Sequence, residues 1–161
     1  MTLRTSRAVA GSLLVAVALM ATACAGRKEG AASSDRELSK RGSIEVTAKL
    51  VEIPEGAIFD RELYNYATVL KYQVLAVHRG RVKGDTIYVG HYNPAKPRSE
   101  VADKRVKDVG GSLKYFRAGQ VHRMALEDSM LDHLTGGILN KYSEEDIDPI
   151  YWAVWTNPAG D

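Results

Sequence analysis

Apolar and polar side chains alternate along much of the chain after residue 43. From Ile44 to Ile53 the apolar residues Ile44, Val46, Ala48 and Leu50 alternate with polar ones, which is the period of a strand with one buried face. Two further runs, Tyr66 to Val77 and Thr86 to Tyr92, are rich in Tyr, Val, Ile and Leu and also favour strands. Gly80 and Gly84 lie between them, in a stretch typical of a hairpin loop.

The C-terminal third continues this pattern. A short strand is predicted over residues 113–116, another over Val121 to Leu126, and a last one over Ile150 to Thr156, where aromatic and β-branched residues dominate. Ser129 fits the N-cap of a short helix that ends at Gly136. Five or six antiparallel strands around one short helix predict a mainly β fold, a small barrel or sandwich.

The N-terminal pattern is different. Arg4 and Arg7 precede an apolar run from Ala8 to Ala21, which is the layout of a secretory signal peptide. As a helix this run would cover only about 20 Å, short of the roughly 30 Å hydrocarbon core, so a permanent transmembrane anchor is the weaker interpretation.

The four residues that end the apolar segment, ATAC, resemble the lipobox of bacterial lipoproteins, with Ala21 where leucine is more frequent. The resemblance implies a signal peptide over residues 1–23 and an acylated Cys24, which would anchor the protein to a membrane. Cleavage by an ordinary signal peptidase after Ala23 or Ala25 is the alternative.

Composition divides the rest of the chain into a tether and one domain. Residues 25–42 hold one leucine and no aromatic or β-branched side chain, so a flexible tether is expected, with a domain over residues 43–161. With the only cysteine, Cys24, used for lipid, the domain has no disulfide.

The net charge of the chain comes from its N-terminal segment. Removing residues 1–23 takes away two arginines and with them the whole net charge of +2, which argues against nucleic acid as a partner.

The sequence has four histidines that could bind a metal or act in catalysis: His78, His91, His122 and His133. They lack the spacing of metal ligands, and neither a metal nor another cofactor is expected. We assign no catalytic residue. However, His91 and His122 lie on strands that can approach across a sheet, which leaves a histidine base as an alternative. Asp128 and Asp132 near His133 are explained by the dipole of the expected helix.

The candidate ligand-binding residues follow the strand that ends at Tyr92, at the start of a polar loop over residues 94–112. They combine an aromatic ring, an amide and two cations on a proline-stiffened path, which suits a carbohydrate or a carboxylate. They are His91, Tyr92, Asn93, Lys96 and Arg98. The alternative is a surface loop whose prolines only end the strand.

Three aromatic residues close the chain: Tyr151, Trp152 and Trp155. In a strand, Tyr151 and Trp155 share one face and Trp152 takes the other, so at least one ring should lie in the core. A ring left exposed would favour sugar stacking or a partner protein.

Two stretches carry a resemblance to a known family. Residues 74–89, with "VLAVHRG" and "GDTIYVG", and residues 116–126, "FRAGQVHRMAL", resemble the OB-fold barrel of netrin-like modules and tissue inhibitors of metalloproteinases. The resemblance implies a small OB-like barrel. Those inhibitors chelate zinc through a free N-terminal cysteine and depend on disulfides, so the chain is not expected to inhibit proteases.

These features predict a lipoprotein, exported and anchored through Cys24, whose OB-like barrel is a non-enzymatic binding or accessory module in the cell envelope. The expected partner is an envelope polysaccharide or an envelope protein complex. Alternatives are a hydrolase or transferase subunit with a histidine base, and a docking module that uses its C-terminal strand. In a cell with two membranes, Ala25 after the cysteine is typical of outer-membrane lipoproteins.

Overall fold

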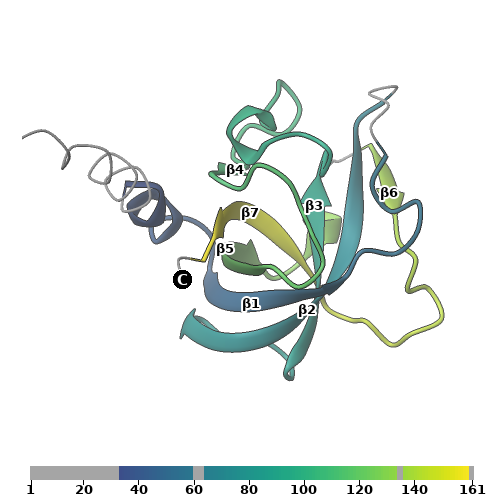
Figure 1. Cartoon of the computed structure of the whole chain (residues 1–161), viewed down its shortest axis with the longest axis horizontal. Coiled ribbons are helices and arrows are strands. Elements are labelled where there is room, and N and C mark those ends of the chain that lie inside the picture. The colour runs from purple at the N-terminus through teal and green to yellow at the C-terminus, as the bar shows by residue number, and fades with distance from the viewer. Residues whose placement is uncertain (1–32, 60–63, 134–135, 160–161) are drawn as a thin grey trace, which may run out of the picture.

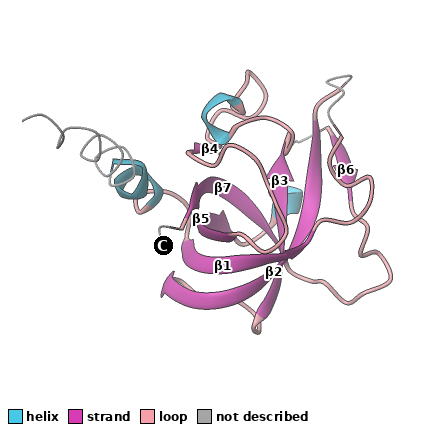
Figure 2. Ribbon diagram, in the orientation of Figure 1, coloured by secondary structure: helices cyan, strands magenta, loops and turns pink. Residues whose placement is uncertain are grey.

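The computed structural model describes residues 33–59, 64–133 and 136–159. Its regular elements run along the chain as shown in Figures 1 and 2. After helical residues 33–38 come β1 (Ile44–Glu52), β2 (Tyr66–Arg79), β3 (Thr86–Tyr92), the 3-10 turn η1 (Arg98–Glu100), β4 (Gly110–Gly111), β5 (Val121–Glu127), the 3-10 turn η2 (Met130–Asp132), β6 (Gly137–Leu139) and β7 (Ile150–Pro158).

Five of the strands form a closed barrel. The order is β1-β2-β3-β7-β5, and β5 pairs back to β1. Four of the five pairings are antiparallel, but β3 and β7 run parallel, with Tyr88 opposite Ile150. The short strands β4 and β6 extend the barrel in parallel, β4 on β7 and β6 on β2.

The expected mainly β, OB-like barrel is confirmed, with a mixed rather than purely antiparallel sheet. The strands with clear alternation form close to where they were expected. Residues 113–116 were wrongly expected to be a strand, whereas β4 and β6 were missed. The helix expected after Ser129 is only the turn η2, although the Ser129 side chain does accept a hydrogen bond from Leu131 N.

The core has two parts, separated by the wall of the barrel. Inward-facing side chains such as Leu50, Tyr72 and Met124 fill the interior. A second cluster packs outside β2, β3 and β7, where Tyr92 and Trp152 meet apolar residues of the long loop. The loop over residues 94–112 is therefore not simply a polar surface segment, because it contributes a buried row of valines: Val101, Val106 and Val109.

The packed structure begins before Ser43, where the sequence placed the domain boundary. Residues 33–38, expected within a flexible tether, are helical, and Leu38 is fully buried. Gly42 adopts a φ of 60°, and a Cβ there would lie 2.4 Å from the Leu126 carbonyl oxygen. Because glycine has no Cβ, it allows this close backbone approach at the point where the chain passes from the helix into β1.

Candidate functional site

Arg98 is the centre of the segment predicted to bind a ligand, and it is buried. Only 3% of its surface is exposed. Its guanidinium donates hydrogen bonds to the carbonyl oxygens of Tyr92 (2.8 Å), Asn93 (2.6 Å) and Lys96 (3.1 Å). Burial lowers the pKa of Arg98 to about 10, so the group remains charged at neutral pH. The cation holds its own loop together.

The candidate ligand-binding residues beside Arg98 also make hydrogen bonds within the protein. The Tyr92 hydroxyl donates a hydrogen bond to Asp103 Oδ2 (2.7 Å). Asn93 accepts one from Tyr66 N (3.1 Å) and donates one to Asn65 Oδ1 (3.0 Å). The expected group does assemble, but His91, Tyr92, Asn93 and Arg98 are buried and Lys96 is half-buried. The hydrogen bonds of Tyr92, Asn93 and Arg98 bind this loop to the rest of the protein, and ligand binding by the segment stays a prediction.

His91 and His122 do come together, inside the barrel. The Tyr72 hydroxyl lies 3.1 Å from His91 Nε2 and 3.1 Å from His122 Nδ1. The Phe116 ring packs against both imidazoles, with centroids 4.7 and 5.7 Å away. Burial lowers the pKa of both histidines, that of His122 to about 4, and the charge of Arg98 lowers that of His91 further. Both rings are therefore neutral at pH 7.

The surroundings of this pair are those of a buried polar network. Among the described residues, the hydrogen-bonding neighbours of the two rings are Tyr72 and Gln120, neither of which is a carboxylate. Both rings are fully buried, and neither lines a surface hollow described below. The arrangement explains the two histidines as parts of a polar network within the barrel core.

His133 has a more open environment. Its Nε2 lies 2.8 Å from Glu127 Oε2, and its ring stacks on Trp152 with centroids 4.8 Å apart. These three residues border a hollow of about 190 Å³, whose rim carries both basic and acidic side chains: Arg105, Lys107, Asp108 and Asp132. No serine, threonine or cysteine is among the described residues that line it.

The C-terminal aromatic rings belong to the fold. Tyr151 and Trp152 are buried, as expected of core positions, and the Arg41 guanidinium covers the Trp155 ring at 4.2 Å. Strand β7 has β5 along one edge and β3 followed by β4 along the other. Its backbone is thus already paired on both sides, which counts against docking through this strand.

An aromatic hollow lies elsewhere, where the sequence offered no pattern. Phe59 stacks on Tyr66 with centroids 4.3 Å apart, and Tyr64 lies beside both rings. Tyr64 is 60% exposed. Together with β6, the three rings line a hollow of about 140 Å³. It sits between two connections of the barrel, the one from β1 to β2 and the one from β5 to β7.

Among the described residues, the lining of this aromatic hollow is apolar apart from the tyrosine hydroxyls and the backbone. The residues from β6 are Gly137, Ile138 and Leu139, and Ile138 is 47% exposed. No charged side chain is among its described lining residues. Flat rings and small apolar groups of this kind suit the carbon-bound hydrogen face of a neutral ligand.

Comparisons with known proteins add no assignment. No protein-family model, curated protein or solved structure matches the chain. Within the described residues, no set of three or more His, Cys, Asp or Glu side chains is placed to hold a metal ion. In that same part of the chain, no helix has the length and apolar character needed to cross a membrane. Cys24 and the predicted signal peptide lie outside the described residues.

Proposed function

We propose that the protein is an exported lipoprotein, anchored through Cys24, whose barrel is a non-enzymatic binding module for a polysaccharide of the cell envelope. The observation that carries the binding role is the exposed Tyr64 beside the stacked rings of Phe59 and Tyr66. A pyranose ring has one face of carbon-bound hydrogens, and such a face packs on an aromatic ring.

The position of the hollow supports the same proposal. OB-fold barrels bind oligosaccharides and oligonucleotides beside their second and third strands, with the loops that join strands one to two and four to five. Here the hollow lies at the start of β2, between the β1–β2 and β5–β7 connections. The described lining residues carry no charge, which favours a neutral sugar over the phosphate backbone of a nucleic acid, because phosphate binding depends on cations.

The test is binding of the purified protein to a panel of envelope oligosaccharides, with Tyr64→Ala compared to Tyr115→Ala. Tyr115 is a matched control because it is 51% exposed and lies outside the hollow. We expect Tyr64→Ala to weaken binding by about fivefold, equivalent to about 1 kcal/mol of ring contact, and Tyr115→Ala to leave it unchanged. Equal loss in both variants, or no glycan bound, would refute the assignment to this hollow.

The same binding experiment also tests the alternative that the protein is a hydrolase or transferase subunit. His133 beside Glu127, on the rim of the mixed-charge hollow, is the one histidine of the described chain with a carboxylate partner at hydrogen-bonding distance. A hydrolase or transferase would change the length of the oligosaccharide. We expect the recovered glycan to be unchanged, and shortened chains that disappear in His133→Asn would favour the enzyme instead.

A further inference from the structure

We infer that residues 33–42 form a clasp that fixes the point where the chain enters the barrel, and that anchoring through the chain on this side turns the aromatic hollow away from the membrane. The hollow would then take a glycan polymer that lies away from the bilayer, and not the head group of a glycolipid in the same leaflet. This inference rests on the proposed anchoring at Cys24 and on the proposed role of the hollow.

The first part of the clasp joins the helix to the last strand. Ser34 Oγ donates a hydrogen bond to Asn157 Oδ1 (2.8 Å), and Asn157 Nδ2 donates one to Asp35 Oδ1 (2.8 Å). Asn157 is 1% exposed, and its Oδ1 also accepts a hydrogen bond from Ser112 N (3.0 Å). A buried side chain of β7 thus connects the helix to the barrel wall and to the long loop.

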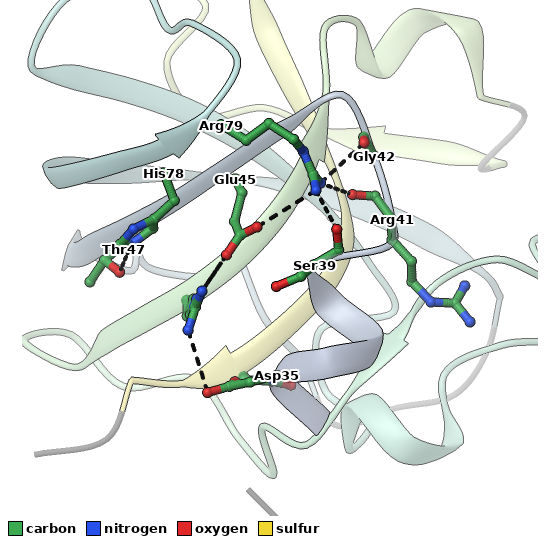
Figure 3. Close-up of polar contacts among 10 residues, drawn as sticks. Asp35, Ser39, Arg41, Gly42, Glu45, Thr47, His78 and Arg79 are labelled. Carbon is green, nitrogen blue, oxygen red and sulfur yellow. Dashed lines mark hydrogen bonds and ion pairs between the residues drawn. The ribbon is translucent and has the colours of Figure 1, made fainter. Parts of the chain in front are cut away.

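The second part is a chain of charges across three strands (Figure 3). Asp35 pairs with Arg123 of β5 at 3.6 Å, and Arg123 in turn donates hydrogen bonds to Glu45 of β1 at 3.0 and 2.5 Å. Arg79, at the end of β2, lies 3.7 Å from Glu45. Its guanidinium also donates to the carbonyl oxygens of Ser39, Arg41 and Gly42, the residues between the helix and β1.

Packing completes the clasp. Leu38 on the helix has no exposed surface, and the Arg41 guanidinium lies over the Trp155 ring. A single exposed ion pair contributes little, but a buried apolar side chain with several hydrogen bonds and a charge network holds a segment in one orientation. Residues 33–42 therefore move with the barrel.

The position of the clasp on the domain determines which side of the barrel faces the membrane. Figure 1 shows the helix at one side of the barrel and β6, which lines the aromatic hollow, at the opposite side. Cys24 precedes Ser33 by nine residues, which span at most about 32 Å when fully extended. A short connection that enters on the helix side places that side toward the bilayer, and the hollow on the far side.

The experiment places a fluorescent probe on each side of the full-length, acylated protein in phosphatidylcholine vesicles that contain a quencher-labelled lipid. The chain has one cysteine, which carries the lipid, so Lys40→Cys and Lys141→Cys each introduce a single labelling position. Lys40 follows the helix and Lys141 lies two residues after β6, and both are exposed. We expect a larger loss of fluorescence from the probe at position 40.

A spacer variant tests whether the short, clasped connection causes the difference. A flexible Gly/Ser spacer of about 20 residues inserted before Ser33 frees the barrel from its anchor. We expect it to bring the two probes close to equal quenching, whereas the same spacer added after Asp161 keeps the difference. Equal quenching without any spacer, or stronger quenching at position 141, would overturn the inference.

A second measurement separates this inference from the proposals on which it rests. We expect the vesicle-bound protein to bind a soluble oligosaccharide. We expect it not to bind the same sugar when that sugar is the head group of a glycolipid in those vesicles. Binding of the glycolipid would overturn the inference. Failure to bind either sugar would refute the glycan-binding role, and failure of the protein to stay on the vesicles would refute the anchoring and the inference with it.

Discussion

Ser34 and Asn157 are 123 residues apart in the chain, and the Ser34 hydroxyl donates a 2.8 Å hydrogen bond to the Asn157 side-chain oxygen. The contact joins the beginning of the described structure to its last strand. A chain cut at Ser43, the boundary that the sequence indicated, would lose this bond together with the whole clasp.

We expect a chain that starts at Ser43 to be less stable than one that starts at Ser33 by about 3–5 kcal/mol. The loss combines the burial of Leu38 with the hydrogen bonds of Asp35 and the carbonyl oxygens that Arg79 binds. Urea unfolding of the two chains measures it. Equal midpoints would mean that residues 33–42 contribute nothing to the barrel.

Arg98 supports its loop from inside, so its removal should affect stability. Replacement by methionine keeps the length of the side chain but leaves three carbonyl oxygens without their donor. We expect Arg98→Met to lower the free energy of unfolding by about 3 kcal/mol. Lys104→Met, at an exposed position of the same loop, is the control and should change it by less than about 0.5 kcal/mol.

The Tyr72 hydroxyl is the shared partner of two buried imidazoles, and Tyr72→Phe removes it without changing the shape of the core. We expect a loss of about 1–3 kcal/mol, since buried ring nitrogens would be left without a partner. Thermal unfolding measures the loss. Tyr115→Phe, which alters an exposed ring, should leave the midpoint where it is, and a similar shift in both variants would contradict this role of Tyr72.

Alternation predicted β1 because Val46, Ala48 and Leu50 are buried while Thr47 and Lys49 between them are not. Aromatic and β-branched composition predicted β2, β3 and β7, which bury side chains on both faces, and β3 (Thr86–Tyr92) has the predicted bounds. The strands β4 and β6 have two and three residues, too few to show a period, and they form only because β7 and β2 offer open edges. Their pairing depends on contacts distant in sequence.

The candidate site was harder to predict for a related reason. Arg98 looked like a surface cation, but its burial is stabilised by carbonyl oxygens of its own loop, and carbonyl groups are the same in every sequence. Phe59 and Tyr64 lie outside any strand, and they border a hollow only because β6 pairs with β2 beside Tyr66. The approach of His91 to His122 could be anticipated, since both lie on predicted strands.

The two neutral histidines make stability depend on pH in a defined direction. Their pKa values in the folded protein are lowered by burial, to about 4 for His122, while an exposed histidine in the unfolded chain titrates near 6.5. Between these values the unfolded chain binds more protons at these two positions than the folded one, so the contribution of the two histidines to stability decreases as pH falls from about 6.5 to about 4 and is constant above that window.

For His122 alone the expected loss over that window is about 3 kcal/mol, and His91 adds to it in the same direction. Urea midpoints measured from pH 7.5 down to 4 test this. In His122→Gln, which keeps a polar side chain beside Tyr72, the slope should become shallower, whereas His78→Gln at an exposed position should keep it. A stability that does not change between pH 7.5 and 4 would show that the two rings take up protons within the folded barrel, against the neutral network described above.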